Sequence, residues 1–251
     1  MIRAETINSV AHVELARPEK KNAITAEMYV MLAAALAAAD ADPQVRAILL
    51  HGSQECFTAG NDVGDFLSRP AGAEPPVVEL FKVLPGLANP IVAAVGGPAV
   101  GIGSTMLLHC DLVYAATNAR FQLPFVPLGI VPEFASTYLL PLLAGYQRAA
   151  ELLLLGQPFS AQKAQEIGMV CEVVPAEQLF AKAREAASTL AALPPESLRL
   201  TKRLLKKRHG AAIAEAIAEE TKIFSERLSS PEAREAMSAF IEKRKPDFSR
   251  F

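Results

Sequence analysis

Residues 89–105 read NPIVAAVGGPAVGIGST and carry no charged side chain. The apolar run over residues 91–95, closed by two glycines and a proline, predicts a buried strand that ends in a tight turn. A helix is expected over 103–109 and a further strand over 111–115. Strands that alternate with helices in this way are typical of an α/β protein with parallel strand pairing.

The alternation extends toward the N-terminus. The pattern predicts a hairpin of strands 4–7 and 10–15, then a helix over 25–40 that begins with a threonine cap, and then a strand over 45–50. Residues 68–76 are rich in proline, glycine and alanine without periodicity, so we expect a mobile surface loop there.

Toward the C-terminus the sequence becomes mostly helical. Ser160 caps a short predicted helix, a strand is expected over 169–174, and a longer helix over 176–193. Only helical patterns follow, which divides the chain into a core of residues 1–195 and an all-helical region of residues 196–251. The second region is too small for its own hydrophobic core, so we expect it to pack on the first or on a neighbouring subunit.

Composition and charge exclude several classes of function. The chain has 251 residues, and its 25 Lys and Arg against 27 Asp and Glu leave a formal net charge of −2. This balance gives no electrostatic basis for binding nucleic acid. The 3 cysteines lie far apart and the first residues predict no signal peptide, so we expect a cytoplasmic location. Scattered histidines and the lack of paired cysteines argue against a metal site.

One uncharged segment, residues 83–110, is long enough to cross a bilayer. Pro85, Pro90 and Pro98 interrupt any continuous helix there. We therefore predict that this segment is buried in the protein core and that the chain does not enter a membrane.

The glycines between Gly96 and Gly103 do not form a nucleotide cradle. The run lacks a following Gly-Lys-Ser/Thr, and Met106 stands where the dinucleotide fingerprint requires a third glycine. At the start of a helix, such glycines can instead expose backbone N–H groups to an anion or a developing oxyanion. The alternative is close packing of this backbone against a neighbouring strand.

The loop over residues 57–63 raises a similar choice. Its small residues could expose the amide of Asn61, while Asp62 would cap the helix that follows. An ordinary capped turn is the alternative.

Glu133 is the only charged residue between Phe121 and Gln147. A carboxylate in such apolar surroundings has a raised pKa, which suits a general base or acid. The alternative is that Pro132 and Glu133 open a helix, with the carboxylate facing water.

Basic residues that could contact a phosphorylated ligand are Arg17, Lys20 and Lys21. Two further basic groups are explained as solvated helix faces. They are Lys202, Arg203, Lys206, Lys207 and Arg208, and Lys243, Arg244 and Lys245.

Several motifs occur in an ordered series along nearly the whole chain. They are Ala16-Arg17-Pro18 with Asn22-Ala23-Ile24, the loop 57–63, the segment 89–103 with Asp111, Phe121 with Pro124-Phe125 and Leu128-Gly129, Phe159-Ser160-Ala161 with Gly168-Met169-Val170, and Ala239-Phe240 with Lys243-Arg244. The series resembles the crotonase (enoyl-CoA hydratase/isomerase) superfamily. The resemblance implies a spiral of ββα turns with a C-terminal helical oligomerisation region, assembled as a homotrimer or hexamer.

The resemblance also implies a site. In this family two backbone N–H groups bind the thioester carbonyl of an acyl-CoA, and the matching amides are those of Asn61 and Ile102. Neither a metal nor a redox cofactor is implied, because CoA is part of the substrate. The residues expected to bind the substrate are Arg17, Lys20, Ala59, Gly60, Gly101, Phe125 and Leu128.

Departures from the family pattern indicate the reaction. Family hydratases carry two glutamates, at positions that are Thr105 and Phe125 here, so hydration is disfavoured. Residues 128–133 are similar to the peroxisomal-type enoyl-CoA isomerases, in which one carboxylate at the position of Glu133 transfers the proton. We therefore expect an isomerase of fatty acid β-oxidation that moves a double bond from C3–C4 to C2–C3. The alternatives are a ring-opening isomerase of phenylacetyl-CoA degradation, a hydratase, or a non-catalytic acyl-CoA-binding scaffold.

Overall fold

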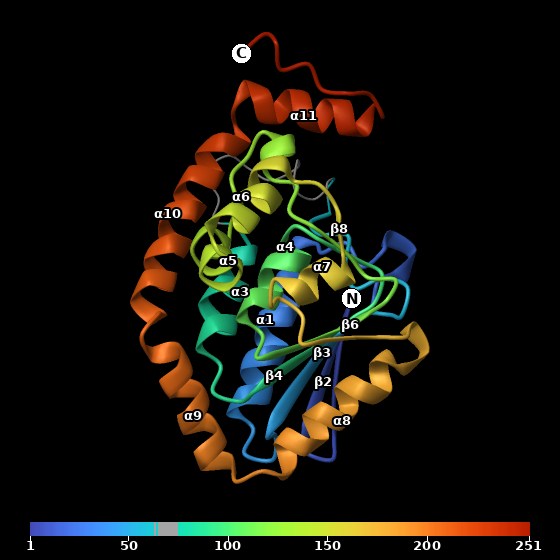
Figure 1. Ribbon diagram of the computed structural model, residues 1–251, viewed down its shortest axis with the longest axis vertical. Coiled ribbons are helices and arrows are strands. Elements are labelled where there is room, and N and C mark those ends of the chain that lie inside the picture. Colours follow the sequence, from blue (N-terminus) through green and yellow to red (C-terminus); the bar gives the residue numbers. More distant parts are fainter. Residues whose placement is uncertain (63, 65–74) are drawn as a thin grey trace.

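The computed structural model describes residues 1–62, 64 and 75–251, and its central element is a six-stranded sheet (Figure 1). The α/β class expected from the sequence is confirmed. The loop predicted over residues 68–76 lies mainly outside the described residues. The strands of the sheet are β1 (Ile2–Ile7), β2 (Val10–Leu15), β3 (Ala47–His51), β4 (Ile91–Val95), β6 (Leu112–Ala116) and β9 (Glu172–Val174).

The strand order in this sheet is β1-β2-β3-β4-β6-β9. β1 and β2 form the predicted antiparallel hairpin, and the other neighbouring pairs are parallel. The hairpin turn places both Asn8 and Ser9 at positive φ, 49° and 64°, as a two-residue turn between twisted strands requires. The strand predicted from the decisive apolar run, β4, lies in the middle of the sheet and pairs with β3 and β6.

Alternate residues of each strand face two separate apolar layers. Leu50 belongs to the larger core, which also takes in helix α1 (Ala26–Ala41). Its neighbour Leu49 belongs to a smaller core under helix α8 (Leu179–Ala192). The hydroxyl of Thr25 accepts a hydrogen bond from the amide of Met28 and thus caps α1 as predicted.

A second, three-stranded sheet carries the glycine run away from the main sheet. It comprises β5 (Pro98–Val100), β7 (Arg120–Gln122) and β8 (Phe159–Ser160). The helix predicted over 103–109 consists of a short α-helix, α4 (Ile102–Thr105), and a 3₁₀ turn, η3 (Met106–His109). The remaining elements used below are the 3₁₀ turns η1 (Pro18–Lys20) and η4 (Val126–Leu128) and the helices α3 (Val77–Val83), α5 (Ser136–Ala144), α6 (Tyr146–Leu155) and α7 (Ala161–Glu166).

The C-terminal region is helical, as predicted. Helices α9 (Pro195–Lys207) and α10 (Gly210–Leu228) run along one side of the molecule, and α11 (Pro231–Ile241) crosses its end (Figure 1). Phe224 of α10 and Ala233 of α11 are buried in the larger core. These helices therefore pack against the rest of the chain, while the boundary at residue 195 and a role in oligomerisation stay predictions.

One of the basic groups does not form the solvated face predicted for it. The side chain of Lys202 is only 7% exposed, and its Nζ lies 2.7 Å from Asp111 Oδ2. The same amine donates a hydrogen bond to the carbonyl of Asn89. Burial lowers the pKa of Lys202, while the charge of Asp111 opposes that change. The lysine thus anchors α9 to the residues that precede β4 and β6. Within this basic group Arg203, Lys207 and Arg208 remain exposed.

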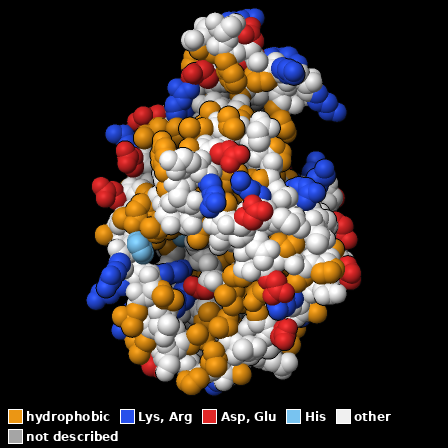
Figure 2. Space-filling model, in the orientation of Figure 1, with side chains coloured by type: hydrophobic (Ala, Val, Ile, Leu, Met, Phe, Trp, Pro, Cys, Tyr) orange, Lys and Arg blue, Asp and Glu red, His pale blue; other side chains and the backbone are white. Residues whose placement is uncertain are grey.

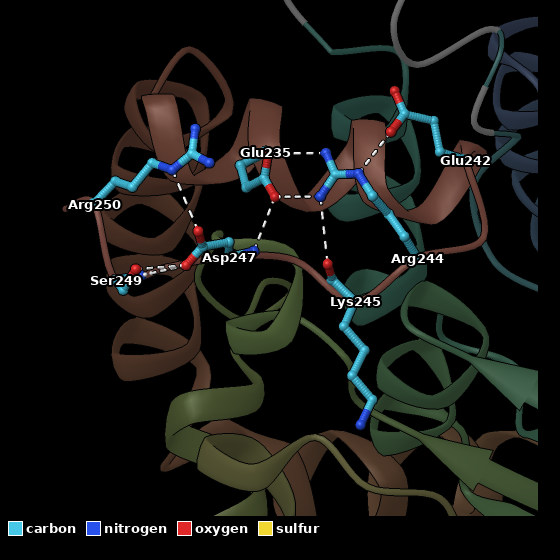
Figure 3. A network of polar contacts seen from close by, with 7 residues as sticks. All are labelled: Glu235, Glu242, Arg244, Lys245, Asp247, Ser249 and Arg250. Atoms are coloured by element: carbon cyan, nitrogen blue, oxygen red, sulfur yellow. Dashed lines mark hydrogen bonds and ion pairs between the residues drawn. The ribbon is translucent and has the colours of Figure 1, made fainter.

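The last residues fold back on α11 through exposed ion pairs (Figure 3). The guanidinium of Arg244 contacts the carboxylates of Glu235 and Glu242, at 2.5 and 2.6 Å. Hydrogen bonds from Arg244, followed by one from the amide of Asp247, lower the pKa of Glu235 to about 2. These contacts hold the chain end in place at a solvated surface, where single ion pairs contribute little stability.

The uncharged segment 83–110 is distributed over β4, β5, α4 and the turns between them, and most of its side chains are buried. Among the described residues, we find no helix with both the length and the apolar character that a bilayer crossing would require.

Candidate active site

The loop that carries Asn61 is fixed by the chain that precedes α1. The amide of Ile24 donates to the carbonyl of Gly60, and the amide of Asp62 donates to the carbonyl of Ile24. In this bridge, the backbone N–H of Asn61 itself points away from Ile24. Within residues 1–62, 64 and 75–251, that N–H donates to no other protein group.

Arg17 supports the same loop. Its Nη1 lies 2.7 Å from Asp62 Oδ2 and also donates to the carbonyl of Ala23 at 3.0 Å. Asp62, which was expected to cap a helix, accepts from Arg17, and the helix start that it would cap lies mainly outside the described residues. Lys20 ends the turn η1 with an exposed side chain, and the amide of Ala59 donates to the carbonyl of Lys21.

The glycine run lies directly against this loop. The amide of Val100 donates to the carbonyl of Thr58, and a Cβ on Gly60 would lie 2.8 Å from the carbonyl oxygen of Val100. A Cβ on Gly103 would approach Thr58 Cγ2 to 2.5 Å. Close packing is thus confirmed for Gly103, whereas a Cβ on Gly101 of the same run would meet nothing within 4 Å.

The same packing sets out a helix N-terminus beside Asn61. Gly101 has φ 55° and ψ −118°, a conformation open to glycine, and α4 begins at the next residue, Ile102. The first N–H groups of a helix have no intrahelical acceptor. In the described part of the chain, the amide of Ile102, like that of Asn61, has no protein acceptor. The two amides therefore come from adjacent backbone segments.

Glu133 lies inside the protein, with 6% of its surface exposed. Helix α5 begins three residues later, at Ser136, so the alternative of a first helical turn facing water is wrong. Phe134 and Ala135 between them both have positive φ, 61° and 56°. Because of this left-handed turn, Glu133 is not part of helix α5, and its side chain is buried.

Two hydroxyl groups bear on this site, one bonded to Glu133 and the other to the side chain of Asn61. Thr105 Oγ1 donates a hydrogen bond to Glu133 Oε1 at 2.5 Å. Tyr29, on α1, is buried and donates to Asn61 Oδ1 at 2.5 Å. Burial, together with the nearby charge of Glu133, raises the pKa of the Tyr29 phenol well above its ordinary value. Tyr29 thus stays protonated and connects the Asn61 loop with the surroundings of Glu133.

The pKa of Glu133 is raised from 4.5 to about 8. Burial is the main cause, because it penalises the charged carboxylate, and the charge of Glu220 adds to it. The hydrogen bond from Thr105 acts in the opposite direction. A carboxyl group with such a pKa can both accept and return a proton near neutral pH.

An aromatic stack closes one side of the Glu133 segment. Phe134 lies between His109 and Phe81, with ring centroids 3.9 and 4.3 Å apart. Burial lowers the pKa of His109 to about 4, so its ring is neutral at neutral pH and adds no positive charge. Beyond the stack lies a mostly apolar cavity of about 540 Å³ between α3 and α10. Figure 2 shows a hollow with histidine atoms at its edge on the side where α10 runs.

A second buried carboxylate lies behind this segment. Glu220 of α10 accepts hydrogen bonds from the amide of Ala135 at 2.6 Å and from the amide and hydroxyl of Thr137 at 2.9 and 2.5 Å. Ala135 has no side chain that could cap α5, so Glu220 supplies the acceptor from a distant part of the chain.

The remaining residues predicted to bind substrate are Phe125 and Leu128. Phe125 is buried at the start of η4, and Leu128 is partly buried against the same core. Their contact with a substrate stays a prediction. No group of three or more His, Cys, Asp or Glu in the described residues is arranged to hold a metal ion.

Three polar residues around the site were not predicted from the sequence, namely Tyr29, Thr105 as a partner of Glu133, and Glu220. A signal existed for Glu220 alone. It occupies the stripe of Ile213, Ile217, Phe224 and Leu228 at helical spacing, where an acidic residue is unexpected.

Comparison with known proteins bears on what this arrangement does. A family model described as "Enoyl-CoA hydratase/isomerase" matches residues 5–250. The chain is 36% identical over 261 residues to a 1,2-epoxyphenylacetyl-CoA isomerase of Escherichia coli K12, covering 96% of this chain and 97% of that protein. It is also 36% identical over 244 residues to enoyl-CoA delta isomerase 2 of Rattus norvegicus, covering 94% of this chain and 62% of that one.

Solved structures agree with the sequence relatives. The crystal structure of an enoyl-CoA hydratase/isomerase from Pseudoalteromonas atlantica T6c superposes with a TM-score of 0.94 at 40% identity, over 99% of each chain.

Proposed function

Because the chain belongs to the enoyl-CoA hydratase/isomerase family of the crotonase superfamily, we propose that it moves the double bond of an enoyl-CoA from C3–C4 to C2–C3. Membership makes an acyl-CoA thioester the expected class of substrate. The relatives include delta isomerases, an epoxyphenylacetyl-CoA isomerase and hydratases, so the choice among reactions rests on the residues of this site.

The observation that carries the proposal is one buried carboxyl group, Glu133, whose hydrogen-bond partner Thr105 lies in the short helix that begins at Ile102. The amides of Asn61 and Ile102 have no protein acceptor among the described residues. The pKa of Glu133, about 8, makes its carboxylate a much stronger base than an exposed glutamate. The C2 proton of a 3-enoyl-CoA is acidified, because its loss gives a dienolate that is delocalised into the thioester. A single carboxylate within reach of C2 and C4 is sufficient for the isomerisation.

The proposed reaction moves one proton from C2 to C4. The carboxylate of Glu133 removes the C2 proton, and the electron pair moves onto the thioester oxygen as a dienolate. The amides of Asn61 and Ile102 stabilise the negative oxygen by hydrogen bonding, as the oxyanion holes of acyl-transfer enzymes do. The protonated Glu133 then delivers the hydrogen to C4, which restores its carboxylate and leaves the double bond at C2–C3. The step requires neither a metal nor a redox cofactor.

The surroundings of Glu133 argue against water addition. A hydratase must hold and activate a water, for which the resemblance implies two glutamates, and Thr105 and Phe125 occupy those positions here. The other carboxylate near Glu133, that of Glu220, has both oxygens engaged by the start of α5. An apolar, aromatic side such as the Phe134 stack also excludes water from a reactive dienolate.

The relationship to the Escherichia coli protein supports a second candidate, the isomerisation of 1,2-epoxyphenylacetyl-CoA. Both reactions need an oxyanion hole and an acid at position 133, so they differ in the shape of the acyl pocket. Parallel assays with 3-hexenoyl-CoA and with 1,2-epoxyphenylacetyl-CoA separate them. Turnover of the epoxide alone would replace our proposal with this candidate, and binding of both thioesters without turnover would indicate a non-catalytic scaffold.

The decisive variant is Glu133→Gln, which keeps the size of the side chain and removes the base. With 3-hexenoyl-CoA we expect kcat to fall by ~10²–10⁴-fold, the usual contribution of a general base. Glu166→Gln, an exposed residue at the end of α7, is the matched control and should behave as the wild type. Unchanged isomerisation by Glu133→Gln would refute the role of Glu133. The homotrimer or hexamer implied by the resemblance stays a prediction that light scattering would test.

A further inference from the structure

We propose that Glu220, on helix α10 of the C-terminal region, is a positioning residue for Glu133. Its carboxylate holds the turn that directs Glu133 into the protein, and it places a negative charge behind the proposed base. This inference rests on the proposed function of Glu133. It makes the C-terminal helical region part of the catalytic unit and not only a packing or assembly element.

Glu220 is hydrogen-bonded to the chain just after Glu133. Glu220 is 6% exposed and accepts three hydrogen bonds from residues two and four positions after Glu133. The donors are the amide of Ala135 and the amide and hydroxyl of Thr137. Amides at a helix N-terminus need external acceptors, and a carboxylate there also complements the helix dipole. Glu220 therefore performs in α5 the function that a local cap usually performs.

The turn that Glu220 holds has a strained backbone. Phe134 and Ala135 are consecutive non-glycine residues in the left-handed region, with φ of 61° and 56°. Such a conformation is strained for a residue with a Cβ and persists only where the surroundings impose it. Glu220 is bonded to the second of the two. Loss of its acceptors would leave buried N–H groups without partners and would release the turn that separates Glu133 from α5.

Glu220 also differs in charge from the other polar groups around Glu133. Four polar groups act on Glu133 or its turn, each from a different element: Tyr29 from α1, Thr105 from α4, His109 from η3 and Glu220 from α10. Tyr29 and His109 are neutral at neutral pH, because burial raises the pKa of the phenol and lowers that of the imidazole.

Glu220 brings a negative charge to this group, and it favours the protonated form of Glu133. The pKa of Glu220 is itself raised, mainly by burial and also by nearby Glu219, while the hydrogen bonds from Thr137 and Ala135 oppose that change. Those three donors therefore help to keep Glu220 charged, and a charged Glu220 strengthens Glu133 as a base.

The test is Glu220→Gln, which keeps the shape of the side chain, loses the charge and loses one acceptor oxygen. With 3-hexenoyl-CoA we expect kcat to fall by ~10–10²-fold with little change in KM, because a displaced base impairs the chemical step. The pH at which kcat/KM levels off should also move down by roughly half a unit, since a like charge near Glu133 has gone. Glu215→Gln, exposed on the same helix, is the matched control and should leave both quantities unchanged.

A second variant separates position from charge. Thr137→Val removes one donor to Glu220 but keeps both carboxylates, so kcat should fall while the pH break does not move down. Circular dichroism checks that each variant folds. If Glu220→Gln does not fold, Thr137→Val decides the matter, and a wild-type kcat in that variant would overturn the inference. A folded Glu220→Gln with wild-type kcat and pH break would overturn it as well.

Glu133→Gln, assayed in parallel, shows which proposal has failed. Activity retained by Glu133→Gln refutes the base itself and with it this inference. An inactive Glu133→Gln beside an unaffected Glu220→Gln refutes the role of Glu220 alone.

Discussion

Thr105 Oγ1 lies 2.5 Å from Glu133 Oε1. Thr105 stands where related hydratases are expected to carry a glutamate, and here it is the hydrogen-bond partner of a different carboxyl group. The two positions come from separate segments, the glycine-opened helix α4 and the left-handed turn before α5. A hydroxyl cannot act as a second carboxylate, but it can stabilise the charged form of the first. This contact is therefore consistent with a one-base reaction and sets the strength of that base.

Replacing Thr105 by valine should reduce the fraction of Glu133 that is ionised, and so able to accept a proton, at neutral pH. Thr105→Val is nearly isosteric and removes a hydrogen bond that lowers the pKa of Glu133. We expect the pH break of kcat/KM to rise by roughly half a unit to one unit, with a severalfold lower rate near pH 7. Thr105→Ser retains the hydroxyl and should stay close to the wild type, and equal profiles for the valine and serine variants would contradict this role.

The wild-type enzyme should become more active as the pH rises toward 8. The proposed base is the carboxylate, and the pKa of Glu133 is about 8, so only a minority of molecules carry it near pH 7. Because the ionised fraction grows about tenfold per unit well below the pKa, kcat/KM with 3-hexenoyl-CoA should rise with a slope near one and then level off. A profile that is flat from about pH 5 to pH 9 would argue against Glu133 as the titrating base.

The same raised pKa predicts how stability depends on pH. The folded-state pKa of Glu133 is about 8, above its ordinary value of 4.5, so between these values the folded chain holds a proton that the unfolded chain has released. The free energy of unfolding contributed by this group is fully present below 4.5 and is lost as the pH rises through 8. Glu133→Gln cannot ionise and should keep that free energy.

Urea unfolding of the wild type and of Glu133→Gln at about pH 5 and about pH 9 measures this difference, because all other titrating groups are common to both. We expect the variant to gain stability relative to the wild type at the higher pH, by on the order of a few kcal/mol. An equal difference at both pH values would mean that the pKa of Glu133 is not raised by folding.

Local patterns were sufficient to predict most of the framework. The apolar run 91–95 predicts a buried strand, and it forms β4, a fully buried inner strand that pairs in parallel with β3 and β6. Thr25 and Ser160 each begin a helix through a side-chain oxygen that accepts from the amide three residues on. These features depend on neighbours in sequence, which is why a single chain was enough to infer them.

The features that were missed or wrong depend on distant partners. Lys202 looks like part of a solvated basic face until Asp111, which precedes β6, is seen to lie against it. Pro132 and Glu133 have the composition of a helix start, but Glu220, far along the chain, caps α5 at a later residue. No local rule reports such a partner, although an acidic residue within the apolar stripe of α10 is the trace that it leaves in the sequence.

Gly101 provides a test of the helix start that presents Ile102. Its φ of 55° and ψ of −118° are costly for any residue with a Cβ, yet a Cβ there would meet nothing within 4 Å. Gly101→Ala should therefore lower the melting temperature through backbone strain alone, by about 2–10 °C, and should reduce kcat as the amide of Ile102 shifts. Gly86→Ala, where a Cβ also meets nothing within 4 Å, is the control and should cause neither change.

The hydroxyl of Tyr29 should matter for the oxyanion site and not for the base. Tyr29 donates to Asn61 Oδ1 at 2.5 Å from a position that is 4% exposed. Tyr29→Phe leaves that oxygen without its partner, at a cost of about 1–3 kcal/mol, and frees the loop whose amide we assign to the oxyanion.

We expect kcat for 3-hexenoyl-CoA to fall by roughly tenfold or more in Tyr29→Phe, because an oxyanion donor acts mainly in the transition state. The pH break should stay where it is, since no charge near Glu133 has changed. Tyr146→Phe, at a residue that is 72% exposed, is the control for loss of a phenol and should match the wild type. A shifted pH break without loss of kcat in Tyr29→Phe would mean that this hydroxyl acts on Glu133 instead of on the Asn61 loop.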